Sequence, residues 1–127
     1  MNIQESAEDY LETILVLGFS GQPIRSVDIA NELDYSRPSV SVAMKNLRED
    51  GYINVGDNGH ITLTDSGREI AESIYERHIL ISDWLVYLGV EKSIAVNDAC
   101  KMEHSMSKQS FNAIKSHIEN RKQEIGK

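Results

Sequence analysis

The feature that limits the fold most is a pair of short β-like runs in a chain whose other segments repeat with a helical period. Residues 52–55 and 60–63 are rich in isoleucine, valine and leucine, and Gly56-Asp57-Asn58-Gly59 joins them. Glycine, aspartate and asparagine between two such runs favour a β-hairpin. The sequence therefore predicts a mainly helical chain with one small hairpin.

Three amphipathic segments precede this hairpin. The first covers about residues 7–18, with Ser6 as the expected N-cap. Ser26 is the expected cap of a short second helix, and Ser36 that of a third helix, which Gly51 ends. Three helices followed by a hairpin predict a winged helix-turn-helix domain, and we place it at residues 1–63.

The third helix has the composition of a DNA-reading helix. Val40, Met44 and Leu47 share one face, while hydroxyls and cations lie on the other. The residues we expect at DNA, from this helix and the segment before it, are Arg25, Ser26, Ser36, Arg37, Pro38, Ser39, Ser41, Val42, Lys45 and Arg48. A solvated amphipathic helix is the alternative. The hairpin loop has no Lys or Arg, so we expect few contacts from it and interpret His60 as a surface residue.

The formal net charge of −7 argues against nucleic acid when it is taken alone. The acidity is uneven, however. Residues 1–12 carry four acidic side chains and no Lys or Arg, whereas Arg37, Lys45 and Arg48 fall in the central segment. A local cationic surface is compatible with this distribution.

Three more helices are expected after the hairpin, in a second domain at residues 64–127. Thr64 caps a long helix that reaches about residue 88 and ends at Gly89. A fifth helix is predicted at about residues 93–105, and a sixth begins near Ser107.

Cys100, Glu103 and His104 stand at positions i, i+3 and i+4 of the predicted fifth helix, so a thiolate, a carboxylate and an imidazole share one face. These are donors that bind transition metals. The alternative is a solvated polar face, since the side opposite to it is apolar: Ala95, Ala99, Met102 and Met106.

Three other residues are weaker metal-ligand candidates. His78 lies on the apolar stripe of the fourth helix, where a single histidine is more often a hydrogen-bonded core residue than a ligand. Asp9 and Glu12 offer hard oxygen ligands, or they complement the dipole at the start of the first helix.

The sequence resembles the diphtheria toxin repressor family and its manganese transport regulator branch. The resemblance extends from Ser6 to about Ile118, and the most specific run is Asn97-Asp98-Ala99-Cys100-Lys101-Met102-Glu103-His104-Ser105-Met106-Ser107. It implies a homodimer formed through the C-terminal helices. It also implies these metal ligands: Asp9, Glu12, His78, Cys100, Glu103 and His104.

The match is mixed between the family's branches. Asp9 and Glu12 resemble the manganese regulators, whereas Cys100 resembles the iron-type repressors. Ser82 and Val96 stand where iron-type members have two ligands of an ancillary site. The resemblance thus implies one or two Mn(II) or Fe(II) ions per subunit, and a second ion would need Asp9 and Glu12.

We therefore expect a metal-dependent repressor of metal-ion homeostasis genes that binds operator DNA. The alternative is a winged-helix regulator that senses an organic ligand or redox state through Cys100 without metal. The chain shows no catalytic signature, so we do not expect an enzyme. It has no membrane span or signal peptide either, so we expect it in the cytoplasm and away from membranes.

Overall fold

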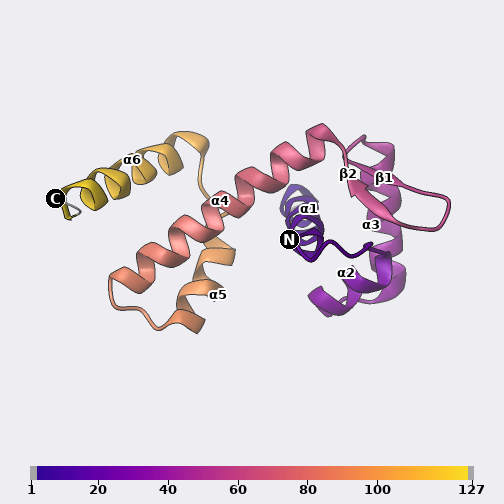
Figure 1. Cartoon of the computed structure of the whole chain (residues 1–127), viewed down its shortest axis with the longest axis horizontal. Helices are drawn as coiled ribbons and strands as arrows, with labels where there is room; N and C mark the ends of the chain where they lie inside the picture. The colour runs from indigo at the N-terminus through magenta and orange to yellow at the C-terminus, as the bar shows by residue number, and fades with distance from the viewer. Residues whose placement is uncertain (1–2, 126–127) are drawn as a thin grey trace. The chain divides into compact units, whose positions relative to one another are not determined.

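The computed structural model describes residues 3–125, which fold mainly into helices (Figure 1). The chain forms two compact units, one ending at Ser73 and the other beginning at Ile74. No helix among residues 3–125 is long and apolar enough to cross a membrane.

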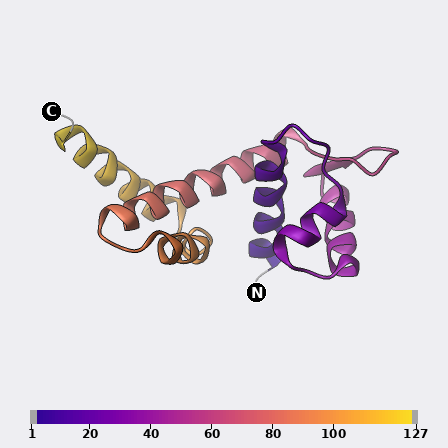
Figure 2. The same cartoon turned by 60° about the horizontal axis from the view of Figure 1, so that its bottom comes forward.

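The first unit contains helices α1 (Ile3–Gly18), α2 (Ser26–Leu33) and α3 (Arg37–Glu49) and strands β1 (Ile53–Val55) and β2 (Ile61–Leu63). The strands pair antiparallel, and α2 packs against α3, as the view in Figure 2 also shows. The predicted winged helix-turn-helix fold is confirmed. Its core is apolar: Leu11, Ile14, Ile29, Val40, Met44, Leu47, Ile53 and Ile61.

The caps predicted for the first two helices need correction. The structure already has helix at Ile3, so Ser6 lies inside α1 and is not its N-cap. The cap of α2 is Arg25 and not Ser26, and the Arg25 backbone N–H donates to Asp28 Oδ2 at 2.9 Å. Nothing in the first residues stops a helix before Ser6, which explains the first error.

Helix α3 begins and ends as predicted. Ser36 Oγ accepts a hydrogen bond from the Ser39 backbone N–H at 3.3 Å, and Pro38 stands in the first turn, where no backbone donor is needed. Gly51, with φ of 84°, follows the end of the helix. The face with Val40 and Met44 is buried.

The second unit contains most of α4 (Asp65–Tyr87) and all of α5 (Lys92–Met102) and α6 (Lys108–Ile125). Thr64 Oγ1 accepts from the Gly67 backbone N–H at 3.1 Å, so the predicted cap of α4 is confirmed.

Leu88 lies beyond the end of α4 and is 59% exposed, so it does not belong to the buried stripe of that helix. Helix α5 ends earlier than predicted, at Met102 instead of about residue 105.

Candidate metal centre and nucleic-acid interface

His78 lies on the face of α4 that faces the core of the second unit. Ile74 and Ile81, one turn before and one turn after it, are buried, and the His78 side chain is half-buried between them. Because it lies on this apolar stripe of α4, the imidazole points towards the end of α5.

Glu103 is the C-cap of α5, and its backbone N–H donates to the Ala99 carbonyl at 2.9 Å. Its side chain follows Ala95 and Ala99 on the buried face, and the residue is 0% exposed. We predicted that Glu103 lies on the polar face of this helix, opposite Ala95 and Ala99. This prediction was wrong, because Glu103 lies on the buried face together with both alanines. The same burial excludes the solvated polar face as an account of Glu103.

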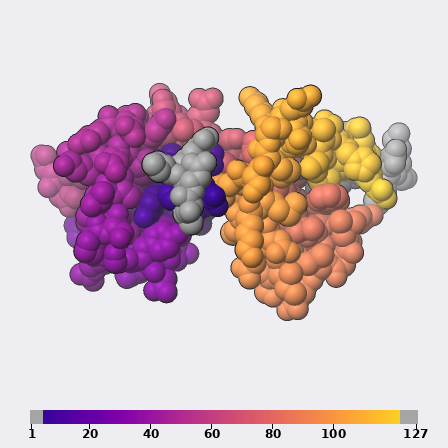
Figure 3. Space-filling view, turned by 180° about the vertical axis from the view of Figure 1, so that it is seen from behind, coloured from indigo at the N-terminus to yellow at the C-terminus, as the bar shows by residue number. Residues whose placement is uncertain are grey.

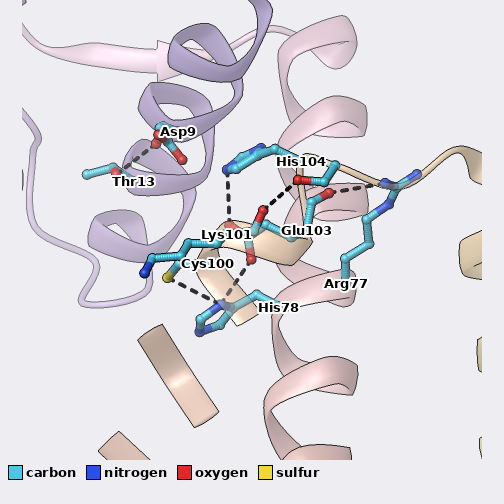
Figure 4. A network of polar contacts seen from close by, with 9 residues as sticks. Asp9, Thr13, Arg77, His78, Cys100, Lys101, Glu103 and His104 are labelled. Carbon is cyan, nitrogen blue, oxygen red and sulfur yellow. Dashed lines mark hydrogen bonds and ion pairs between the residues drawn. The ribbon is translucent and has the colours of Figure 1, made fainter. Parts of the chain in front are cut away.

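The side chains from α4 and from the end of α5 meet around Glu103 (Figure 4). His78 Nδ1 lies 3.0 Å from Glu103 Oε2 and 3.7 Å from Cys100 Sγ. On the other side, His104 Nε2 lies 3.3 Å from Glu103 Oε1. His78 is therefore no isolated core histidine, because two candidate ligands meet it.

The neighbours of His78 favour its protonated form. Hydrogen bonds to Cys100 and then to Glu103 raise the pKa of His78 from 6.5 to about 10, although burial acts in the opposite direction. A cation held by the same ring nitrogen takes the place of that proton.

The donor atoms fit a transition-metal ion. His78, Cys100 and Glu103 offer one nitrogen, one sulfur and one oxygen atom, all within 4.8 Å of one another. This set combines the borderline imidazole with a soft thiolate and a hard carboxylate. The residues present are thus able to hold a divalent ion without a change of fold.

In the first unit, the residues expected at DNA lie on α3, at its N-cap and at the start of α2. Nine of the ten predicted residues are exposed, and Ser26 is half-buried. Ser26 lines a surface pocket with Ser41, Lys45 and Arg48, so two hydroxyls and two cations surround one hollow. The purple atoms of Figure 3 belong to this helix-turn-helix region.

Two features of this surface were not visible in the sequence. Arg25 Nη2 donates to His60 Nε2 at 3.3 Å, so a cation next to α2 reaches a hairpin that has no Lys or Arg in its loop. Ser36 Oγ also donates to Ser39 Oγ at 2.8 Å, so both hydroxyls take part in the cap of α3. Arg25 and His60 are 35 positions apart in the sequence, so no local signal indicated their contact.

Comparison with known proteins decides the family. The iron-dependent repressor N-terminal DNA-binding domain matches residues 2–61, and the metal-binding and dimerisation domain of the same repressors matches residues 64–124. A helix-turn-helix transcriptional regulator of Methanocaldococcus jannaschii is 34% identical over 125 residues, which cover 97% of this chain and 100% of that protein. The chain belongs to the iron-dependent repressor family.

Other members support the same assignment. MntR of Salmonella typhimurium is 34% identical over 87% of this chain and 71% of its own length. The structure of the manganese regulator SloR is similar at 26% identity, with a TM-score of 0.79, over 89% of this chain and 53% of that one. The chain thus spans about half the length of SloR, and 45% of the iron-dependent repressor IdeR of Mycobacterium tuberculosis.

As an iron-dependent repressor family member, the chain is a DNA-binding transcriptional regulator of the metal-dependent type and is not an enzyme. The comparisons give no support to a metal-independent sensor of an organic ligand or of redox state.

Asp9 and Glu12 lie on α1, in the first unit. Because α1 is already helical at Ile3, both residues stand beyond its first turn, where the helix dipole has little effect. The Asp9 backbone carbonyl accepts from Thr13 Oγ1 at 2.8 Å (Figure 4). Their role as metal ligands stays a prediction.

Ser82 and Val96 are the residues at which the chain departs from the iron-type pattern. Ser82 is buried, and its Oγ donates to the Ile79 carbonyl within the same helix at 3.2 Å. Val96 offers no donor atom, so neither position adds a strong ligand.

Proposed function

We propose that this chain represses metal-ion homeostasis genes by binding operator DNA when His78, Cys100, Glu103 and His104 hold a divalent ion. The observation that supports this most is the convergence of three different donor atoms within 4.8 Å in a chain of the iron-dependent repressor family. Glu103 is central to the arrangement, because it contacts both histidines and is buried.

The ion is Mn(II) or Fe(II) in this proposal, with one or two ions per subunit, and Asp9 and Glu12 complete the ligand set. The donor chemistry supports both metals, since thiolate favours iron and carboxylates favour manganese. When bound, the ion also offsets part of the chain's charge of −7 near the DNA phosphates.

The DNA-binding surface is the exposed side of α3 with the residues next to α2. Lys45 and Arg48 contact phosphate at the pocket they share with Ser41, and Val42, which is 61% exposed, contacts base edges. The remaining residues of the surface are Arg25, Ser26, Ser36, Arg37, Pro38 and Ser39.

The active form in this proposal is a cytoplasmic homodimer. Two copies join through the C-terminal helices, and each presents its winged helix, at residues 1–63, to one half-site of the operator. The family model for a dimerisation domain, which matches residues 64–124, supports this arrangement.

The test measures DNA binding with and without metal. A duplex is selected from a random-sequence pool with manganese-loaded protein, and its affinity is then measured in manganese and in chelator. We expect at least about tenfold tighter binding with metal, or about 1.4 kcal/mol. Equal affinity in both conditions would contradict the proposal.

Glu103→Gln should raise the manganese concentration needed for half-maximal DNA binding, because a buried ligand oxygen is lost. Glu69→Gln is the matched control, since Glu69 is an exposed carboxylate on α4. If Glu103→Gln responds to manganese as the parent does, the cluster does not hold the ion.

A further inference from the structure

Arg77 precedes His78 on α4, and its side chain reaches the backbone that follows α5. Its Nη1 donates to the Glu103 carbonyl at 3.1 Å (Figure 4). The same atom donates to the Met106 carbonyl at 2.9 Å. The guanidinium also stacks over the Phe111 ring of α6, 5.0 Å from the ring centroid. One side chain of α4 therefore contacts both the end of α5 and the beginning of α6.

Two neighbouring residues of α4 thus contact Glu103, one at its side chain and the other at its main chain. His78 contacts the side-chain carboxylate, and Arg77 contacts the main-chain carbonyl. Residues 103–106 lie just beyond the last turn of α5, so helix hydrogen bonding alone does not fix their backbone. A planar guanidinium with several donors in a rigid fork is suited to fix two carbonyls at once.

We propose that Arg77 is a positioning residue of the metal centre. By clamping the Glu103 and Met106 carbonyls against Phe111, it sets where the Glu103 and His104 side chains stand relative to His78. This proposal rests on the metal centre proposed above. It adds a residue that binds no metal but determines the geometry of the residues that do.

Cobalt(II) is the probe, because its visible bands report on the coordination geometry and its near-ultraviolet bands report on a bound thiolate. Titration of the 127-residue chain with Co(II) is followed by absorption for the parent, Arg77→Met and Arg77→Lys. Arg68→Met is the matched control, since Arg68 is an exposed arginine on the same helix. Circular dichroism of each metal-free variant checks its fold.

We expect Arg77→Met to bind Co(II) about tenfold or more weakly and with an altered spectrum, since loss of a residue that orients metal ligands commonly costs 10–100-fold in affinity. Arg77→Lys should lose affinity as well, because one ammonium group does not reproduce the fork. Arg68→Met should match the parent.

Parental affinity and spectrum in Arg77→Met would overturn the proposal. If that variant does not fold, Arg77→Lys decides the matter by the same two measurements. A parent protein that binds no Co(II) would contradict the proposed metal centre itself, whereas a binding parent with an equally good Arg77 variant would contradict only the role of Arg77.

Discussion

At the scale of single residues, Cys100 determines the character of the proposed metal centre. It is the softest donor of the cluster, it is exposed, and it lies 3.7 Å from His78. Glu103, in contrast, is a hard donor and fully buried. The two residues therefore differ in the metals they favour and in their access to solvent.

Replacing Cys100 with Glu should shift metal preference from iron towards manganese. A carboxylate in place of the thiolate weakens Fe(II) binding relative to Mn(II), and we expect the affinity ratio to change by about tenfold, or about 1.4 kcal/mol. The measurement is anaerobic competition of the two ions for parent and variant. An unchanged ratio would show that Cys100 is not a ligand.

The exposed face of α3 allows a prediction about charge. Lys45→Ala should weaken DNA binding and reduce the slope of log affinity against log salt by about one, because one phosphate contact releases about one counterion. Affinity for manganese in the absence of DNA should stay as in the parent. Lys108→Ala, at the start of α6, is the control, and an equal loss of salt dependence there would contradict the placement of Lys45.

At the scale of secondary-structure elements, the start of α4 is pressed against the strand region. A Cβ atom built at Gly67 would overlap the carbonyl oxygen of Tyr52 and lie 3.0 Å from its carbonyl carbon. Thr64 fixes this junction, since its Oγ1 donates to the Gly51 carbonyl at 2.7 Å and caps α4.

Gly67→Ala should therefore lower the free energy of unfolding by about 2 kcal/mol, because the backbone of Tyr52 has to move. Urea denaturation followed by circular dichroism measures the change. Ser66→Ala, at the exposed neighbouring position, should stay within about 0.5 kcal/mol of the parent. Equal stability of the parent and both variants would mean that the Tyr52 backbone moves away from position 67 at no cost in free energy.

Local sequence signals predicted the ends of a helix correctly where the contacts that fix those ends are close in the sequence. Ser36, Pro38 and Gly51 act within a few residues of α3, and both of its ends were predicted correctly. The end of α5 was not, because Glu103 turns into the core and its carbonyl accepts from Arg77, 26 residues earlier in the chain.

The distance along the chain between contacting residues also determines which parts of the proposed metal centre were predictable. Cys100, Glu103 and His104 were visible through their spacing. The contact of His78 with Glu103, over 25 residues, needed the fold. The positioning role proposed for Arg77 was not visible, because Arg77 contacts backbone carbonyls, which every sequence contains.

At the scale of the whole molecule, α4 belongs to both units, beginning in the first and carrying His78 in the second. If metal and DNA bind at different units of one chain, the two affinities are linked thermodynamically. This linkage works in both directions.

Operator DNA should tighten manganese binding by the same factor by which manganese tightens DNA binding. Manganese titrations with and without saturating duplex measure one factor, and DNA titrations with and without manganese measure the other. A duplex that the protein does not select is the control. If the two factors differ beyond error, binding at the two sites is not described by a single coupled equilibrium.

The close approach at Gly67 has an evolutionary consequence. Any amino acid that replaces this glycine introduces a side chain where the Tyr52 carbonyl already lies. Replacement of Gly67 is therefore selected against unless the turn before α4 changes length first. In related sequences, a side chain at this position should appear only together with an insertion or deletion between the second strand and α4.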